Sequence, residues 1–573
     1  MPSDPPKPEP AKANPHANPH ANPQANPQAN PQAEPQTEPQ TEPQTNPQAE
    51  PPRTHPPHAE TQADPPPAGP PRAPVRPAEL REAGPGVDPL LSDADADRLA
   101  DALRSAGYTA EAVVALLGEE AAGALARGER VPGLRATTGG SPLETLVRLF
   151  LLGSTEPTDA VLAALPLAAA PAIAAILLEP DGDGYRAAID LRPYEGEWWV
   201  VADLGTDVRP GPVRPDHVLG VGPASLTLAS ATVRRPVGTA LDIGTGCGVQ
   251  ALHLSQHAGT VTGTDVLPRA LAMASLTARL NGLHWELIEG DLLAPVEGRR
   301  FDLVVSNPPF IVGPGDGGFA YRDSGLAGDE VSRRLIRRAP SALADGGRCQ
   351  LLANWIYRRG ESWEDRLAGW LDGLGCDAWV WQREVADPSQ YAALWLSDAG
   401  EKGSPAYEAR YSRWLDWFAA TGVEAIGFGL VTLRRSGADR PTVRIEEVPQ
   451  PIDEPAGPEV ARWFDRLDAL RGVDVGAVRF DRAPGLQLEQ TAAPGPEGWE
   501  VTAQRLRQPA GLRWTAPIDP AVAALVAGCD GTRPLREIAL VLELAYGIES
   551  GQVAEMARAL AERGFLIPTD SLE

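Results

Sequence analysis

The chain has 573 residues, with 77 acidic and 51 basic side chains and a formal net charge of −26. This length favours three or four domains. The acidic balance weakens a nucleic-acid partner without excluding one, because a net negative protein gains no general attraction to polyphosphate. Its four cysteines, Cys247, Cys349, Cys376 and Cys529, are far apart in the sequence, which supports neither a zinc site nor a disulfide framework.

Residues 1 to about 77 are rich in proline and almost free of large apolar side chains. Nine tetrads run from Ala13 to Gln48, among them Ala-Asn-Pro-His, Ala-Asn-Pro-Gln and Thr-Glu-Pro-Gln. A proline in every fourth position forbids a regular helix, and the repeat contains nothing that could form a core. We predict a disordered, partly polyproline tail over residues 1–77, and favour a solvated spacer over a ligand for a proline-reading partner.

Neither a secretory signal nor a membrane span is expected. The N-terminus lacks a charged segment followed by an apolar one. The apolar run 161–178 is interrupted by Pro166 and Pro171 and is dominated by alanine, which is typical of helices in a soluble domain. These features predict a cytoplasmic protein without a membrane partner.

Two small helical modules are predicted on either side of a larger domain. In the first, over residues 85–205, Ser92 precedes a helix, a second helix covers 143–152, and strands cover 185–191 and 198–201. In the second, over 455–573, helices at 518–529, 535–546 and 553–563 are followed by a short strand at 565–567. Both patterns are typical of winged-helix-like domains, whose helices bind DNA, bind protein or form lids.

The segment 210–435 is expected to form an α/β domain with a mostly parallel, doubly wound sheet, because β-type and helical stretches alternate along it. Helices are predicted at 268–280 and 330–343. The predicted strands cover residues 239–243, 260–264, 285–288, 302–305, 348–353, 378–381 and 426–433.

A glycine-rich turn follows the first of these strands, in the sequence Asp242-Ile243-Gly244-Thr245-Gly246-Cys247-Gly248. Glycines allow a tight turn and let the backbone approach a ligand. The pattern departs from the dinucleotide-binding Gly-x-Gly-x-x-Gly, because Val249 occupies the third glycine position, and no Gly-Lys-Ser/Thr phosphate loop is present. Asp242 suits a cationic ligand end such as an α-amino group, which favours S-adenosylmethionine over NAD as cofactor.

Acidic residues also end the next two strands. Asp265, 17 residues after Gly248, is placed to bond ribose hydroxyls, and Asp291 is placed to accept from an adenine amino group. Val266 and Leu292 follow these acids and are assigned to the same nucleoside site. Each acid alone is a common loop residue, but their order at successive strand ends favours one cofactor site.

The fourth strand leads into Asn307-Pro308-Pro309-Phe310. The Asn307 side-chain oxygen and the Pro308 carbonyl can accept the two N–H bonds of a planar nitrogen, and so direct its lone pair toward a methyl donor. The prolines restrict the backbone, and Phe310 offers a ring on which a planar target can stack. Beyond this motif, the glycine-rich loop 313–325 is a candidate for substrate contacts through Tyr321, Arg322 and Asp323.

With the glycine loop, this motif resembles class I methyltransferases that act on amide or exocyclic amine nitrogens. The region 237–353 is most similar to the HemK/PrmC family of protein-glutamine methyltransferases, whose Asp-x-Gly-Thr-Gly-x-Gly loop matches residues 242–248 and whose later Arg…Ala…Leu…Gly-Gly stretch resembles residues 337–347. The resemblance implies an S-adenosylmethionine-dependent enzyme with a Rossmann-like fold. It makes Asp242, Gly244, Gly246, Asp265 and Asp291 cofactor contacts and Asn307 the clamp of the substrate amide. We assign Thr245, Gly248, Val266, Leu292 and Asn307 to the same cofactor site, and Asn307, Pro308 and Phe310 to the acceptor site.

The acceptor stays open at this point. Phe310 replaces the tyrosine usual in the glutamine enzymes, and the sequence Asn-Pro-Pro-Phe is commoner among rRNA guanine and tRNA adenine methyltransferases. A protein glutamine is therefore the first expectation, an RNA or DNA base (adenine N6 or guanine N2) the second. A cofactor-sensing regulator is the alternative outside enzymes. No metal is implied, and His217, His253, His257 and His284 are expected in surface or helix-capping positions.

Overall fold

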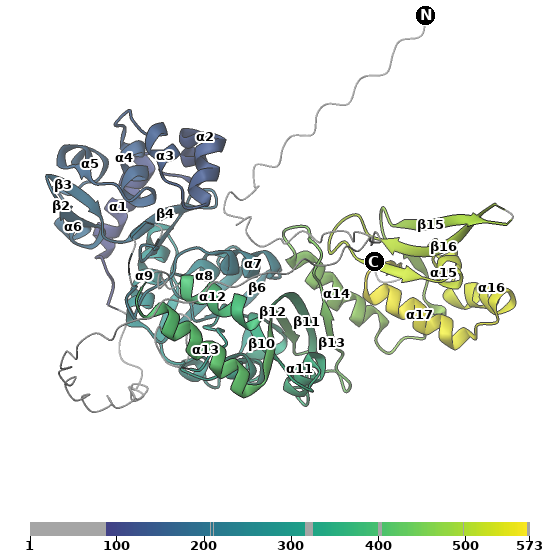
Figure 1. Cartoon of the computed structure of the whole chain (residues 1–573). Helices are drawn as coiled ribbons and strands as arrows, with labels where there is room; N and C mark the ends of the chain where they lie inside the picture. Colours follow the sequence, from purple (N-terminus) through teal and green to yellow (C-terminus); the bar gives the residue numbers. More distant parts are fainter. Residues whose placement is uncertain are drawn as a thin grey trace, which may run out of the picture. The chain divides into compact units, whose positions relative to one another are not determined.

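The structure is a computed structural model that describes residues 88–569, apart from 207, 210, 212, 316–324, 399–403 and 497. The predicted tail over residues 1–77 therefore lies outside the described residues, as do Tyr321, Arg322 and Asp323. Figure 1 shows the described part in sequence colours, with helices α1 to α6 in purple and blue, the large sheet in teal and green, and α15 to α17 in yellow-green to yellow.

An eight-stranded sheet forms the centre of the α/β domain, in the order β13-β11-β12-β10-β9-β6-β7-β8. Strands β6 to β10 are mutually parallel, whereas β12 is antiparallel to both β10 and β11. All seven predicted strands are confirmed, and β13 is an edge strand that the sequence analysis missed. The strands are β6 (Val237–Ile243), β7 (Ala258–Asp265), β8 (Glu286–Glu289), β9 (Phe301–Ser306), β10 (Leu343–Arg358), β11 (Asp377–Ala386), β12 (Val423–Arg434) and β13 (Val443–Glu447).

Successive strand residues point to opposite faces of this sheet and enter different cores. Leu241 and Val304 belong to a core shared with α10 and α11, while Ala240 and Leu303 belong to one shared with α7, α8 and α14. Both faces are therefore covered, as in a doubly wound fold. The helices of this region are α7 (Pro223–Ala231), α8 (Val249–Leu254), α9 (Pro268–Leu280), α10 (Glu330–Arg338), α11 (Trp363–Leu371), α12 (Pro388–Asp398), α13 (Tyr407–Thr421) and α14 (Gly457–Leu470), with short 3₁₀ turns at Ala294–Val296 and Ala339–Ala342.

The N-terminal region begins with the predicted helix, whose first turn is capped because the Ser92 hydroxyl accepts from the backbone N–H of Asp95. The single strand expected at 185–191 is in fact two: β3 pairs with β2, and β4 forms a hairpin with β5. The chain passes from the three-stranded β1-β3-β2 sheet to the β4–β5 hairpin. Strand β5 of this hairpin is held against α9, because the Val201 N–H donates to the Thr277 hydroxyl. The elements are α1 (Asp93–Ser105), α2 (Ala110–Ala126), α3 (Val131–Ala136), α4 (Pro142–Leu146), a π-helical turn (Val147–Leu151), β1 (Glu156–Pro157), α5 (Thr158–Ala164), α6 (Pro171–Leu177), β2 (Leu178–Asp181), β3 (Gly184–Ala187), β4 (Asp190–Tyr194) and β5 (Trp198–Ala202).

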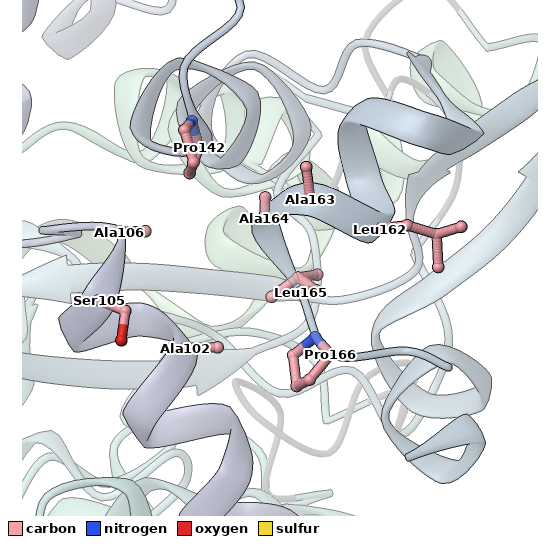
Figure 2. Close-up of a pocket in the computed structure, with 9 residues that line it drawn as sticks. All are labelled: Ala102, Ser105, Ala106, Pro142, Leu162, Ala163, Ala164, Leu165 and Pro166. Atoms are coloured by element: carbon pink, nitrogen blue, oxygen red, sulfur yellow. The ribbon is translucent and has the colours of Figure 1, made fainter. Parts of the chain in front are cut away.

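A cavity of about 310 Å³ lies in this N-terminal region, between α1, the first residue of α4 and the end of α5 (Figure 2). Its lining is made of small and apolar residues, and Ser105 is the one polar side chain among them. No titratable group lines it, and none of its residues belongs to a strand of the large sheet.

The C-terminal region contains the three predicted helices and the final strand. It also contains a three-stranded antiparallel sheet, β15-β16-β17, that the sequence analysis missed. Most residues of β15 and β16 are exposed, so these strands lack the alternation of apolar and polar residues by which a half-buried strand is recognised. The elements are a 3₁₀ turn (Val475–Ala477), β14 (Phe480–Arg482), β15 (Gln487–Gly495), β16 (Gly498–Arg507), β17 (Thr515–Ile518), α15 (Pro520–Gly528), α16 (Leu535–Tyr546), α17 (Ser550–Glu562) and β18 (Leu566–Pro568). Among the described residues, no helix combines the length and apolarity needed to cross a membrane.

Candidate functional site

The glycine loop between β6 and α8 adopts a conformation that requires its glycines. Gly244, Gly246 and Gly248 have φ values of +69°, +56° and +88°, a region that other residues rarely adopt. The N–H groups of Gly244 and Thr245 both donate to the carbonyl of Thr264, at 2.8 and 2.9 Å. The loop is thereby fastened to the end of β7 and leads directly into α8.

This loop lies at the point where the strand order of the sheet reverses. Strand β6 pairs with β7 on one side and with β9 on the other, so the crevice beyond the carboxyl ends of β6 and β9 is the expected ligand site of such a fold. The buried hydroxyl of Ser306 donates to the carbonyl of Ile243 at 2.8 Å and joins the two strand ends. It brings Asn307 next to the glycine loop.

Asp242 is a buried carboxylate with one oxygen unused. The residue is only 1% exposed, and its Oδ2 accepts a hydrogen bond from the Thr245 hydroxyl at 2.7 Å. Its Oδ1 makes no hydrogen bond of good geometry with the described residues, although the backbone N–H of Ala251 in α8 is close enough to lower the pKa of the carboxyl. Burial raises the pKa of Asp242 to about 7, and the nearby charge of Asp265 adds to the effect. A buried acceptor without a donor is rare, and this one suits a cationic or N–H-donating ligand.

Asp265, at the end of β7, supports the loop from the other side. Its Oδ2 accepts from the backbone N–H of Gly246 and its Oδ1 from that of Leu267, each at 2.9 Å. Burial raises its pKa despite these hydrogen bonds. Each carboxylate oxygen accepts one of these bonds and keeps further acceptor capacity. The residue predicted to bond ribose therefore also holds the glycine loop in place.

The third strand end lies beside this carboxylate, because the N–H of Gly290 donates to the backbone carbonyl of Asp265 at 2.9 Å. Asp291 follows and is exposed. Leu292 has a φ of +48°, an unfavourable value for a leucine, and its carbonyl accepts from the Thr264 hydroxyl at 3.2 Å. Val266 is 47% exposed, so an apolar surface is available next to the two acids.

Asn307 is anchored by a residue that the sequence analysis did not identify. Its Nδ2 donates to the hydroxyl of Ser225, near the start of α7, at 3.3 Å. The Ser225 carbonyl in turn accepts from the Gln250 side chain of α8 at 2.7 Å. Because the amide NH₂ is engaged in this way, the Asn307 oxygen is the end left to accept from a substrate. The sequence contains no local signal for this contact, because the two residues are 82 positions apart.

Phe310 is less available for stacking than the sequence suggested. The residue is only 9% exposed. Its ring packs edge-to-face on Trp395 of α12, and the two ring centroids are 6.2 Å apart. Pro308 is buried and Pro309 half-buried. The four-residue motif is therefore firmly seated, and the use of the Phe310 ring as a stacking face stays a prediction.

A second overlooked residue, Tyr391 of α12, holds the segment that follows the motif. Tyr391 is fully buried, and its hydroxyl accepts from the backbone N–H of Val312 at 2.8 Å and from the Asn354 amide at 2.9 Å. Its ring lies 6.0 Å from that of Trp395. The concentration of aromatic residues in α12 and α13 is the only trace of this role in the sequence.

Two of the four histidines are not where the sequence analysis expected them. His217 and His253 are buried, whereas His284 is exposed and His257 half-buried. The Nε2 atom of His253 lies 2.7 Å from the Tyr194 hydroxyl oxygen. Burial lowers the pKa of His253 to about 3, so its ring is neutral and has a structural role. Its burial follows from the β4–β5 hairpin packing over α8, which local spacing does not reveal.

Cys247, in the middle of the glycine loop, is buried. Burial raises the pKa of its thiol to about 12, which keeps it protonated and a poor nucleophile. Among residues 88–569 as described, no group of three histidine, cysteine or acidic side chains is arranged to hold a metal ion.

Comparison with known proteins identifies three regions of the chain. A model of the methyltransferase small domain matches residues 220–362. Models described as domains of unknown function, DUF7059 and DUF7782, match residues 105–188 and 461–568. The region 220–362, matched by the methyltransferase small domain, contains the glycine loop, the acidic strand ends and Asn307.

Individual relatives match a part of the chain. The ribosomal RNA small subunit methyltransferase C of Alcanivorax borkumensis is 36% identical over 117 residues, or 20% of this chain and 32% of that protein. The release factor glutamine methyltransferase of Deinococcus radiodurans is 38% identical over 142 residues, or 23% of this chain and 50% of that protein. The chain thus spans 32% and 50% of the length of these two relatives.

Among solved structures, a methyltransferase from Pyrococcus furiosus aligns with 38% of this chain and 85% of its own, at 19% identity and a TM-score of 0.24. A score this low supports no statement about the fold, which stands on the sheet topology itself. The sequence matches confirm the resemblance to class I methyltransferases. Residues 220–362 of this chain match the methyltransferase small domain, and the relatives named above are methyltransferases.

Proposed function

We propose that the domain over residues 210–435 is an S-adenosylmethionine-dependent N-methyltransferase. The observation that carries the proposal is the unused, buried Oδ1 of Asp242 beside a positive-φ glycine loop at the reversal point of the sheet. Such a site fits a ligand with a cationic amino end and a nucleoside. That cofactor, when bound, supplies a methyl group activated by a positively charged sulfonium.

Different residues around the crevice would contact different parts of the cofactor. Asp242 takes the amino end, and the loop glycines allow the backbone to approach the ligand without a Cβ in the way. Asp265 takes the ribose hydroxyls. Val266 and Leu292 give an apolar surface to adenine, whose amino group is within the expected reach of Asp291. Asn307 closes the site at the end where the methyl group is transferred.

On the acceptor side, the Asn307 oxygen and the Pro308 carbonyl accept the two N–H bonds of a planar nitrogen. This orients a delocalised lone pair toward the methyl group and removes much of the entropic cost of the reaction. The bound cofactor would supply an electrophilic methyl group to the nitrogen oriented in this way, and the methylated nitrogen would release one proton to solvent. No side chain has to accept the proton during the transfer, in agreement with the neutral, buried state of His253.

We propose a macromolecular acceptor, with the side-chain amide of a protein glutamine as the first choice. The similarity to a release factor glutamine methyltransferase and the net charge of −26 both favour it. A nucleobase amine is the second choice, because Phe310 and the relatives named rRNA methyltransferases favour it. A regulator that only senses the cofactor would not need the Asn307 motif. A cytoplasmic location agrees with either acceptor.

The test of this proposal is a binding and transfer experiment. Calorimetry is expected to show micromolar binding of S-adenosylmethionine and no appreciable binding of NAD, because the loop has Val249 in place of the third dinucleotide glycine. Incubation with methyl-labelled cofactor and a cell extract should then label material that is sensitive to protease. Label lost to nuclease instead would favour the nucleobase, and tight NAD binding would disprove the assignment.

Removing the hydroxyl of Tyr391 is expected to loosen the acceptor side of the site. The Tyr391→Phe variant leaves the N–H of Val312 and the Asn354 amide without their acceptor, at a cost of about 1–3 kcal/mol. We expect about a 10-fold slower methyl transfer with unchanged cofactor affinity, and faster hydrogen exchange in the peptide containing Val312. Tyr411→Phe, whose exposed hydroxyl donates to the Ser389 carbonyl, is the matched control and should behave like the wild type.

A further inference from the structure

Asp203, the residue that follows β5, is a buried carboxylate that joins three segments of the chain. Both of its oxygens accept from the guanidinium of Arg269 in α9, Oδ2 from Nε at 3.1 Å and Oδ1 from Nη2. Its Oδ2 also accepts from the backbone N–H of Val218 at 2.9 Å, and its own backbone N–H donates to the Val218 carbonyl at 3.0 Å. One residue therefore holds the end of β5, the start of α9 and the segment around Val218 together.

The ion pair with Arg269 reaches the cofactor end of the candidate site. Arg269 is the second residue of α9 and lies four positions after Asp265. Between them, the backbone N–H of Leu267 donates to the Asp265 Oδ1 at 2.9 Å, and the Leu267 carbonyl accepts from the N–H of Leu271 at 3.2 Å. A two-pronged guanidinium–carboxylate pair fixes orientation as well as distance. Asp203 thus fixes the start of α9, and with it the turn that carries Asp265.

The hydrogen bond from Val218 reaches the acceptor end. Val218 is buried in the core that the N-terminal region shares with α8 and α9. The chain beyond it stays close to β5, since a Cβ added at Gly220 would lie 3.4 Å from the Cβ of Ala202. Seven residues after Val218, the Ser225 hydroxyl accepts from the Asn307 amide at 3.3 Å. The position of Val218 therefore affects where α7 begins and how the Asn307 amide is held.

Building on the proposed methyltransferase function, we propose that Asp203 is a positioning residue that fixes the cofactor end and the acceptor end of the site relative to each other. Stability alone does not require this carboxylate, because a buried ion pair contributes little more than well-packed apolar side chains of similar volume. Methyl transfer does require such a link, since a misplacement of about 1 Å between donor and acceptor slows a reaction strongly.

The cofactor end is tested by removing the ion pair. Arg269→Gln and Asp203→Asn each remove it, while the asparagine oxygen can still accept from the Val218 N–H. Each variant should weaken S-adenosylmethionine binding about 10-fold in calorimetry, the scale of one hydrogen bond to a charged group. Because the two side chains act as a unit, the double variant should bind about as weakly as either single one.

Thr277→Val is the matched control. It removes another buried hydrogen bond between α9 and β5, eight residues further along the helix, and should lower the melting temperature without changing the cofactor affinity. Wild-type affinity in Asp203→Asn, or an equal loss of affinity in Thr277→Val, would overturn the positioning role and leave the proposed function intact. A wild type that does not bind S-adenosylmethionine would overturn both.

Asp203→Ala separates the acceptor end from the cofactor end, because it removes the side-chain acceptor of the Val218 N–H together with the ion pair. We expect the same loss of affinity as in Asp203→Asn and, in addition, about a 5-fold slower transfer at saturating cofactor. The rate is measured with methyl-labelled S-adenosylmethionine as donor and a cell extract as acceptor. Hydrogen exchange in the peptide that contains Ser225 should be faster in Asp203→Ala only. Equal rates and equal exchange in the two Asp203 variants would contradict the link to Asn307.

Discussion

Replacing Asn307 by alanine is expected to lower the single-turnover rate of methyl transfer by about 10²-fold or more, the scale of lost positioning. The reason lies in the division of its amide: Nδ2 is anchored on Ser225, and the oxygen is left for the acceptor. The side chain therefore acts on the nitrogen to be methylated and hardly on the cofactor. The affinity for S-adenosylmethionine, measured by calorimetry, should stay close to that of the wild type.

Ser225→Ala is the matched variant for this prediction. It leaves Asn307 in place but removes the acceptor that fixes the orientation of its amide, so we expect a smaller loss of about 10-fold in rate. A cofactor-sensing protein would show no turnover to lose in any of these variants. Equal rates for Asn307→Ala and the wild type would mean that the motif only ends a strand, and the proposed mechanism would have to be abandoned.

Replacing Asp242 by asparagine is expected to weaken S-adenosylmethionine binding by about 10- to 100-fold, corresponding to about 1.5–3 kcal/mol for a hydrogen bond to a charged group. Wild-type affinity should also depend on pH. Because the pKa of Asp242 is about 7, the carboxyl must lose a proton before it can pair with a cation, so binding should strengthen as pH rises through 7. The variant should lack this dependence on pH, as measured by calorimetry between pH 6 and pH 8.

The same carboxyl should affect the stability of the ligand-free protein in the opposite direction. Its pKa in the folded state lies above that of an unfolded aspartate, so the folded state binds the proton more tightly. The free energy of unfolding therefore falls as pH rises from the unfolded pKa to about 7. At pH 8 without ligand, Asp242→Asn should melt at a higher temperature than the wild type. A lower melting temperature together with unchanged affinity would remove Asp242 from the cofactor site.

The positions of the candidate site residues could be predicted because they depend on short segments of sequence. The positive φ values of Gly244, Gly246 and Gly248 are a property of glycine itself, and the sequence places the three glycines directly after an apolar strand. Asp265 and Asn307 end strands that were recognisable from their apolar runs. Since parallel strands end at one edge of a sheet, their ends could be expected to meet.

The tertiary structure decided which atoms in the site are free to act. The contacts that leave one oxygen of Asp242 unused and turn the Asn307 oxygen away from Ser225 depend on the packing of α7 and β6, and no local pattern encodes them. The burial of His253 under the β4–β5 hairpin and the hydrogen bond from Val312 to Tyr391 likewise join segments 59 and 79 residues apart.

The sequence by itself therefore determined the fold class, the glycine loop and the strand-end residues, because hydrophobic periodicity and glycine geometry act over a few neighbouring residues. Only the tertiary structure separated the two apolar faces of α16 into a buried one and an exposed one. A helical repeat of Leu and Val residues reads the same whether the partner is the protein's own core or another molecule. The difference arises when α15 and α17 cover one face and leave Leu544 in solvent.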